Sequence, residues 1–226
     1  MSDDSVYESA YKGDFDVVKS EIEKDSSVIT RKDSNDRILL HWAALSGNVR
    51  LVTYLLELGS PVDPLDDTES TPLILASSAG RIEIVKLLLT YGANPNTKTD
   101  QGHSALQYAC SKGWTEVVEK LLEYKADINI SDKRGATPMH RAASKGNLSV
   151  VKLLLSQFEK PNVNARDVYG NTPLHLACEE DRQEEAKLLV IHGADAEMLN
   201  HDGKTPLDLC TISLRRILSN IKNNLN

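Results

Sequence analysis

The sequence lacks the features that mark most enzymes, membrane proteins and secreted proteins. It contains no glycine-rich phosphate loop, no nucleophile elbow and no paired acid and base, so we expect no catalytic activity. It has no long apolar run of the kind that spans a membrane. Its cysteines, Cys110, Cys178 and Cys210, include no C-x-x-C pair, which indicates reduced thiols rather than a disulfide framework.

An excess of positive charge is also missing. The 226 residues include 26 Lys and Arg against 33 Asp and Glu, which gives a net charge of −7. We therefore expect no nucleic-acid partner and no binding to a membrane surface, because both need basic patches. The acidic, polar start MSDDSVYES is neither a secretory signal nor an arginine-rich transit peptide. These features predict a location in the cytoplasm and nucleus.

What the sequence does contain is a six-residue frame that recurs along the chain. The copies are ILLHWA, TPLILA, SALQYA, TPMHRA, TPLHLA and TPLDLC, which begin at Ile38, Thr71, Ser104, Thr137, Thr172 and Thr205. Successive copies start 33, 33, 33, 35 and 33 residues apart, and SVYESA at Ser5 fits the frame loosely. We therefore predict one domain, residues 1–226, with seven stacked repeats that start near 5, 38, 71, 104, 137, 172 and 205. The first and last repeats would act as caps.

Each repeat also carries signals for its local structure. Gly102 and its counterparts favour a tight turn, and a Thr-Pro pair such as Thr71-Pro72 favours the start of a short helix. That helix ends near a glycine such as Gly47, and a second helix with apolar residues at helical spacing follows. Where the second helix ends, Lys125 replaces the usual glycine, so we expect a slightly strained termination there.

The T-P-L-H-x-A frame at a period of 33 residues, with linkers such as YGANPN and HGADAE, resembles the ankyrin-repeat family over essentially the whole chain. The resemblance implies an all-α solenoid of seven helix-turn-helix units with β-turn fingers. In this family the fingers and first helices form a concave binding side. The departure is the single 35-residue spacing. We place its extra residues near Phe158 to Pro161, in the loop after a second helix, where insertions cost little.

The stretch TPLHLACEED brings His175 close to Cys178 and raises the question of a zinc site or a nucleophile with its base. Comparison between repeats argues against both, because the histidine position holds Ile, Gln or Asp elsewhere and Cys178 aligns with small residues such as Ala143. We interpret the cysteines as small apolar residues and expect no metal and no cofactor. We interpret three histidines as structural, bonded near the helix start and the adjoining turn: His41, His140 and His175.

The same stretch spells L-x-C-x-E with Leu176, Cys178 and Glu180, which resembles a docking motif for the retinoblastoma-protein pocket. Such motifs usually bind in an extended form, whereas these residues follow Thr172 and Pro173 into a predicted helix. We therefore expect Cys178 to point inward and the motif to be presented only after local unfolding.

Longer stretches, DRILLHWAALSGN, TPMHRAASKGNL and GNTPLHLACEEDRQEEAKLLV, resemble the gankyrin family of ankyrin-repeat chaperones of the proteasome regulatory particle. The resemblance implies binding to the C-terminal domain of one proteasomal ATPase subunit while the particle assembles. It also implies links to a cyclin-dependent kinase, the retinoblastoma protein and a ubiquitin ligase that acts on p53. We expect the chain itself to be a monomer.

Candidate contact residues lie on the fingers and first helices of the second to fifth repeats. An acidic third finger and basic fourth and fifth repeats suit a folded partner with the reverse pattern of charge. The family's contact residues fall on Arg37 and Lys112, and we expect both to be exposed cations that the stack itself does not need. The full predicted set is Asp36, Arg37, Trp42, Leu45, Asp66, Asp67, Glu69, Leu75, Tyr108, Lys112, Arg134, Arg141 and Lys145.

Two other functions are compatible with the sequence. One is a small ankyrin inhibitor that docks on a cyclin-dependent kinase, although such arrays are usually shorter. The other is a generic cytoplasmic adaptor. Ankyrin arrays share a scaffold and differ in their exposed side chains, so the fold alone does not decide between these functions.

Overall fold

The computed structural model describes residues 4–225, which form α-helices joined by loops. In this range the only β feature is an isolated bridge between Lys98 and Ser104. The helices are α1 (Asp4–Lys12), α2 (Phe15–Lys24), η1 (Ser26–Ile29, a 3₁₀ helix), α3 (Leu39–Ser46), α4 (Val49–Glu57), α5 (Pro72–Ser78), α6 (Ile82–Thr90), α7 (Ala105–Lys112), α8 (Thr115–Glu123), α9 (Pro138–Lys145), α10 (Leu148–Ser156), α11 (Pro173–Glu179), α12 (Gln183–Ile191), α13 (Pro206–Leu209) and α14 (Ile212–Leu225).

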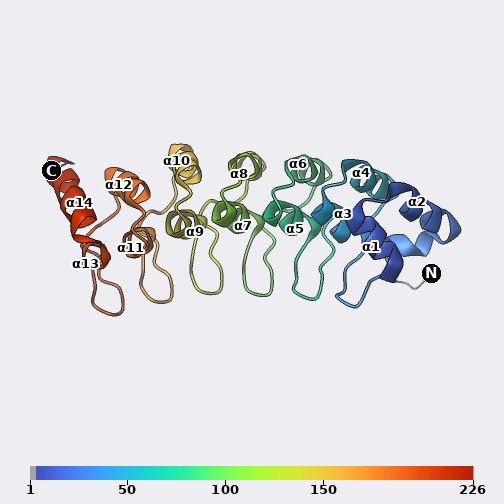
Figure 1. Ribbon diagram of the computed structural model, residues 1–226, viewed down its shortest axis with the longest axis horizontal. Helices are drawn as coiled ribbons and strands as arrows, with labels where there is room; N and C mark the ends of the chain where they lie inside the picture. Colours follow the sequence, from blue (N-terminus) through green and yellow to red (C-terminus); the bar gives the residue numbers. More distant parts are fainter. Residues whose placement is uncertain (1–3, 226) are drawn as a thin grey trace. The chain divides into compact units, whose positions relative to one another are not determined.

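The helices belong to two compact units. Unit 1 holds residues up to 108 together with 120–126, and unit 2 holds residues 109–119 together with those from 127 onward. Within each unit the first helices of successive repeats pack on one another, as α3 does on α1 and α5, and as α11 does on α9 and α13. The finger loops project from the side of these first helices, and the second helices form the opposite layer (Figure 1).

Local signals in the sequence explain where the helices begin and end. The hydroxyl of Thr71 accepts a hydrogen bond from the backbone N of Ile74 at 3.3 Å, and Pro72 occupies the first turn, where no donor is lost. Gly47 ends α3 in the left-handed region with φ of 87°. Lys125 takes the same region with φ of 67° after α8, so the predicted strained helix end is confirmed.

The core combines small and large apolar residues of the first helices, such as Ala143 and Leu73, with branched residues of the second helices. In unit 2, Ala143 of α9 and Cys178 of α11 are buried, which confirms the interpretation of this position as one reserved for small side chains. The second helices bury leucines, among them Leu55 and Leu88 in unit 1 and Leu154 in unit 2. Burial of such side chains, repeat by repeat, is the main source of stability in stacked arrays.

A hydrogen-bond ladder connects the loops that follow the second helices. In unit 2 the side-chain oxygen of Asn129 accepts from the backbone N of Asn162 at 2.7 Å. Asn164 accepts in the same way from the backbone N of Asp195 at 2.8 Å, and its Nδ2 donates to the carbonyl of Gly193 at 3.1 Å. An amide suits this position because it supplies both an acceptor and a donor.

Unit 1 has an asparagine at one corresponding ladder position, where Asn96 Nδ2 donates to the carbonyl of Lys125 at 3.2 Å, and a carboxylate at the other, Asp63. Asp63 Oδ2 accepts from the backbone N of Asn94 at 2.8 Å, but Oδ1 is buried and has no hydrogen-bond partner among the described residues. Burial raises the pKa of Asp63, and the bond from Asn94 offsets only part of that effect. The ladder of unit 1 therefore contains a local defect that an asparagine would remove.

The longer repeat carries its extra residues where they were expected. Helix α10 ends at Ser156, and Phe158 in the following loop is 100% exposed. Lys160 Nζ donates to the carbonyl of Leu155 at 2.8 Å, which fastens the loop to the end of the helix. The insertion leaves the packed helices undisturbed, so the predicted placement is confirmed.

Candidate protein-binding surface

Most of the fingers are held by a carboxylate that binds the backbone of its own turn, while the hydroxyl of Thr99 and the amide oxygen of Asn200 accept the equivalent bonds in two others. Asp66 Oδ1 accepts from the backbone N of Thr68 at 3.0 Å and of Ser70 at 2.8 Å. In unit 2, Asp132 Oδ1 accepts from the backbone N of Arg134 at 2.8 Å and of Ala136 at 3.0 Å. Hydrogen bonds to a charged acceptor are the stronger kind, so these carboxylates fix the shape of the fingers.

This geometry corrects the prediction that Asp66 is an exposed contact residue. Its side chain is 0% exposed and also binds Arg37, so it is part of the finger's internal structure. Burial alone raises the pKa of Asp66, but the hydrogen bonds from Thr68, Ser70 and Arg37 outweigh burial and lower it. Sequence position could not show this, because neighbouring Asp67 has the same residue type and is exposed.

Arg37 is likewise not the free cation that the sequence predicted. Its Nε donates to Asp66 Oδ2 at 2.9 Å, and its guanidinium carbon lies 4.8 Å from the centre of the Trp42 ring. The pair links the second finger to the third, since the two residues belong to successive repeats. The expectation that the stack does not need Arg37 is therefore wrong. Arg141 pairs in the same way with buried Asp132 in unit 2.

Each of the three frame histidines connects its own repeat to the finger of the next repeat. His140 Nδ1 accepts from the backbone N of Thr137 at 3.1 Å, so the ring proton lies on Nε2, which is 3.0 Å from the carbonyl oxygen of Asn171. His175 makes the same contacts with Thr172 and with Lys204 of the next finger. Burial lowers the pKa of His140 and His175, and of His41 in unit 1, which keeps the rings neutral. Their structural interpretation is confirmed.

The other predicted residues of unit 1 lie on its fingers and first helices. Asp36, Asp67 and Glu69 are exposed on the second and third fingers. Four partly exposed side chains follow on α3, α5 and α7: Trp42, Leu45, Leu75 and Tyr108. Apolar and aromatic side chains beside exposed charges are the usual composition of a protein-binding surface. That these residues contact a partner stays a prediction.

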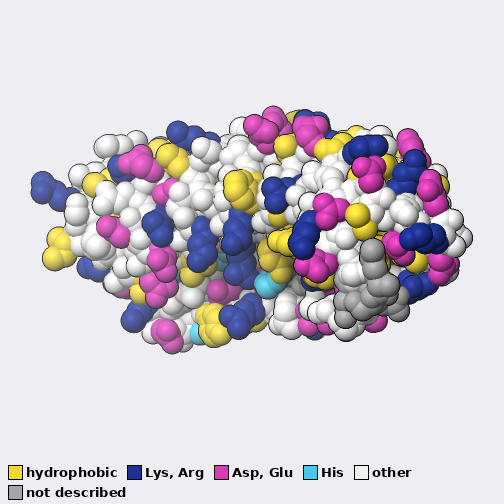
Figure 2. Space-filling view, turned by 45° about the vertical axis from the view of Figure 1, so that its right-hand side comes forward, with side chains coloured by type: hydrophobic (Ala, Val, Ile, Leu, Met, Phe, Trp, Pro, Cys, Tyr) yellow, Lys and Arg dark blue, Asp and Glu magenta, His cyan; other side chains and the backbone are white. Residues whose placement is uncertain are grey.

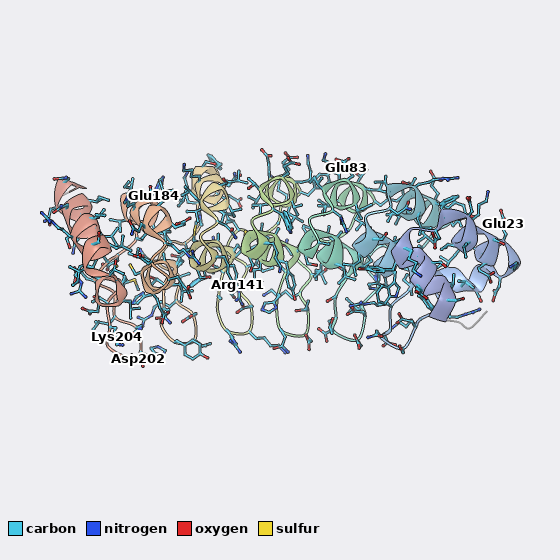
Figure 3. The ribbon with its side chains drawn as sticks, in the orientation of Figure 1. Glu23, Glu83, Arg141, Glu184, Asp202 and Lys204 are labelled. Carbon is cyan, nitrogen blue, oxygen red and sulfur yellow. The ribbon has the colours of Figure 1, made fainter. Side chains whose placement is uncertain are left out.

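Unit 2 presents basic residues on the corresponding elements. Lys112 and Lys145 are exposed in the last turns of α7 and α9, and Arg134 is exposed on a finger. None of these three forms an ion pair with a carboxylate of the described residues. Figure 2 shows Lys and Arg side chains standing side by side on the visible face. Arg141 lies on the finger side of α9, whereas Glu184 lies on the opposite side of the unit (Figure 3).

The L-x-C-x-E residues do not form an extended segment. Leu176 and Cys178 lie in α11, where Cys178 is 1% exposed, and Glu180 follows as the cap residue. The prediction that Cys178 points inward is confirmed. A hydrogen bond with Cys210, together with burial, raises the pKa of the Cys178 thiol, and burial raises that of Cys110. Both are therefore poor nucleophiles.

The described residues include neither a metal-ion cluster nor a membrane-spanning helix. No group of three His, Cys, Asp or Glu side chains is arranged to hold a metal ion in this part of the chain. None of the helices described between residues 4 and 225 is long and apolar enough to cross a membrane.

Sequence reasoning missed the residues that build the fingers. Asp33 and Asp132 occupy the same repeat position as Asp66, and each accepts hydrogen bonds from the backbone of its own finger. The signal was present as an acidic residue three positions before the residue at the finger tip, as Asp33 precedes Asp36 and Asp132 precedes Gly135. Comparing that position between repeats, as was done for the histidines, would have identified it.

Comparison with known proteins places this geometry among characterised folds. A family model described as "Ankyrin repeats (3 copies)" matches residues 6–99 and 91–167, and one described as "Ankyrin repeats (many copies)" matches residues 154–210. The crystal structure of the human ASB11 ankyrin repeat domain superposes with a TM-score of 0.84 at 28% identity and covers 96% of each chain. The predicted fold class, an all-α ankyrin-repeat solenoid, is therefore confirmed.

A shorter stretch matches a proteasome-related protein. Over 63 residues the chain is 45% identical to the 26S proteasome non-ATPase regulatory subunit 10 of Mus musculus, and 47% identical to that of Rattus norvegicus. The stretch is 28% of this chain and 27% of either relative, so the match spans little more than a quarter of their length. The predicted resemblance to the gankyrin family is confirmed over that stretch. Together with the family models, the comparisons show that the chain belongs to the ankyrin-repeat family and is a protein-binding scaffold.

Proposed function

We propose that this scaffold is a non-catalytic assembly chaperone of the proteasome regulatory particle, which binds the C-terminal domain of a proteasomal ATPase subunit. The observation that carries the proposal is the 63-residue likeness to the 26S proteasome non-ATPase regulatory subunit 10. Ankyrin repeats act by binding other proteins through their fingers and first helices. The proposal places the chain in the cytoplasm and nucleus as a monomer.

The charges of unit 2 support a partner that carries carboxylates. Lys112, Arg134 and Lys145 have no ion-pair partner among the described residues, so a partner's Asp and Glu side chains would meet cations that are not already neutralised. Complementary charge of this kind speeds association and excludes partners with the wrong pattern. In unit 1, Asp36, Asp67 and Glu69 would instead meet basic residues.

The proposal is tested by titrating the full chain with the isolated C-terminal domain of each proteasomal ATPase subunit in a calorimeter. We expect one of these domains to bind with a dissociation constant at or below about 1 μM, which corresponds to about −8 kcal/mol. The other ATPase domains are the controls. Binding of none of them by the folded chain would contradict the proposal.

A further inference from the structure

A hollow in unit 1 lies where α1 meets the second finger and α3. Its volume is about 280 Å³, and its walls include the aromatic rings of Tyr7, Tyr11 and Trp42. The carboxylate residues Glu8 and Asp33 also line it. No Lys, Arg or His is among its lining residues in the described part of the chain. The hollow is therefore aromatic and negatively charged.

The walls of the hollow are fixed by contacts within the chain. Trp42 Nε1 donates to Asp33 Oδ2 at 2.8 Å, and the Tyr7 hydroxyl donates to the carbonyl of Arg31 at 2.9 Å. The Tyr11 ring meets the Trp42 ring edge-on, with 5.8 Å between the ring centres and an angle of 79° between their planes. Because these orientations exist before any partner arrives, binding would cost little ordering of side chains.

Of the two carboxylates that line the hollow, Asp33 has no cation among its hydrogen-bond partners, whereas Glu8 pairs with Lys12. Asp33 Oδ1 accepts from the backbone N of Asn35 and of Arg37, and its other oxygen accepts from the indole, so all three donors are neutral. Glu8 lies at the rim, where its Oε1 binds Lys12 at 2.7 Å. Both side chains of this ion pair are exposed to solvent, so the pair is weak. An incoming cation can therefore replace Lys12 at Glu8.

We propose that this hollow binds the cationic side chain of a Lys or Arg residue presented by a partner protein. Aromatic faces attract cations, and the attraction grows when the cation leaves bulk water. The Arg37 guanidinium already lies 4.8 Å from the centre of the Trp42 ring, so an incoming cation would meet the Tyr11 ring and the carboxylates of Glu8 and Asp33. The volume is slightly below the range of about 300–1,000 Å³ typical of small-molecule sites and suits one long side chain.

The inference does not depend on the identity of the partner. Failure to bind a proteasomal ATPase domain would leave it intact, and a hollow that binds no cation would leave the proposed function intact. The chain offers a direct reporter, because it contains only two tryptophans, Trp42 in the hollow and Trp114 at the start of α8. The variant Trp114→Phe makes Trp42 the sole tryptophan of the full chain.

The test titrates Trp114→Phe with a capped glycine peptide that carries a central arginine, and follows tryptophan fluorescence. The matched ligand has citrulline, which is neutral and nearly the same shape. We expect a saturable change with arginine at millimolar concentration and at least about fivefold weaker binding with citrulline. The indole N–H signal of Trp42 in the NMR spectrum of the unsubstituted chain provides a second readout.

Side-chain variants locate the binding within the protein. Adding Tyr11→Ala should weaken arginine binding by about fivefold, because it removes one ring of the hollow, and Glu8→Gln should weaken it less. Tyr91→Ala is the matched control, since Tyr91 is 43% exposed against 51% for Tyr11 and lies outside the hollow. Equal binding of arginine and citrulline, or unchanged binding by a folded Tyr11→Ala protein, would overturn the inference.

Discussion

The fingers of the two units share one internal design and differ at their tips. In both units a carboxylate binds the finger backbone, as Asp66 does in unit 1 and Asp132 in unit 2. At the tip of the turn, however, the second and third fingers of unit 1 place Asp36 and Glu69 in the left-handed region, each with φ of 59°. The next finger of unit 1 places Gly102 there with φ of 82°, and the following finger, in unit 2, places Gly135 there with φ of 75°. The shared part is what the fold requires, and the tips are where the repeats are free to differ.

The left-handed finger tips at Asp36 and Glu69 cost stability. A residue with a side chain is strained in the left-handed region by about 1 kcal/mol, and glycine is not. The second and third fingers of unit 1 therefore keep exposed carboxylates at the expense of stability, while the finger of unit 2 that carries the exposed cation Arg134 has a relaxed turn at Gly135.

The largest effect should come from the shared finger carboxylates. Asp66→Ala removes an acceptor of several hydrogen bonds and leaves Arg37 without its partner, so we expect a loss of about 3 kcal/mol in the free energy of unfolding. Asp132→Ala in unit 2 should cost a similar amount, since it binds its finger and Arg141 in the same way. Urea denaturation measures both.

The matched control for Asp66→Ala is Asp67→Ala, because Asp67 is exposed and adjacent. It should change stability by less than about 0.5 kcal/mol. Equal effects of the two variants would show that the finger carboxylates are not structural.

The histidines should make unit 2 more sensitive to acid than unit 1. Burial lowers the pKa of His41, His140 and His175 in the folded chain, so the unfolded chain takes up protons first as the pH falls below about 6.5. Their contribution to stability is therefore present above that pH and is lost below it. Unit 2 contains two of these residues and unit 1 contains one.

Glutamine variants provide the test, because Gln107 already occupies this position and accepts from the backbone N of Ser104 at 3.0 Å. The unsubstituted chain should lose stability between pH 7 and pH 5. The double variant His140→Gln with His175→Gln should lose less over that range than the single variant His41→Gln. Melting temperatures across that pH range decide the point. An unchanged pH profile in the double variant would mean that other groups cause the acid sensitivity.

Asp63→Asn should stabilise unit 1 by repairing its ladder. The amide would supply a donor at the position of the unpartnered Oδ1 and remove a buried charge, so we expect a gain of about 1 kcal/mol at pH 7. Because the pKa of Asp63 is raised, the carboxyl is more readily protonated in the folded chain, and the gain should shrink as the pH falls toward the carboxyl range. Chemical denaturation at neutral and acid pH gives both values.

A control for Asp63→Asn is Asn164→Asp, which introduces the same defect into unit 2. It should lose the bond to the Gly193 carbonyl and destabilise the chain by a similar amount. A stabilising Asn164→Asp would contradict the account of the ladder.

The smallest effect should come from relaxing a finger tip. Glu69→Gly relieves the left-handed strain of the third finger but makes the unfolded chain more flexible, so we expect a net gain of about 0.5 kcal/mol. Asp36→Gly should gain less, because aspartate tolerates this region better than glutamate. The reverse change in unit 2, Gly135→Glu, should destabilise, and thermal melting measures all three variants.

Repeats made most of the fold predictable from the sequence, while contacts between repeats decided the details of the candidate surface. The frame gave the helix starts and ends, the small position of Cys178 and the role of the histidines, because each recurs at the same place. The pairing of Arg37 with Asp66 was not predictable in this way, since it joins residues 29 positions apart. The hollow beside Trp42 escaped notice for the same reason, as its walls come from separate elements.

We propose that the exposed cations of unit 2 bind a partner protein. Charge reversal of Lys112 and Lys145 tests this proposal most directly. Both are exposed at equivalent positions of α7 and α9, and neither has an ion-pair partner among the described residues, so Lys112→Glu with Lys145→Glu should leave melting nearly unchanged. Titrated in a calorimeter against the proteasomal ATPase C-terminal domain, the double variant should bind at least about tenfold more weakly, a change of about 1.4 kcal/mol. Lys152→Glu, exposed on second helix α10, should bind like the unsubstituted chain. Undiminished affinity in a folded double variant would contradict the account.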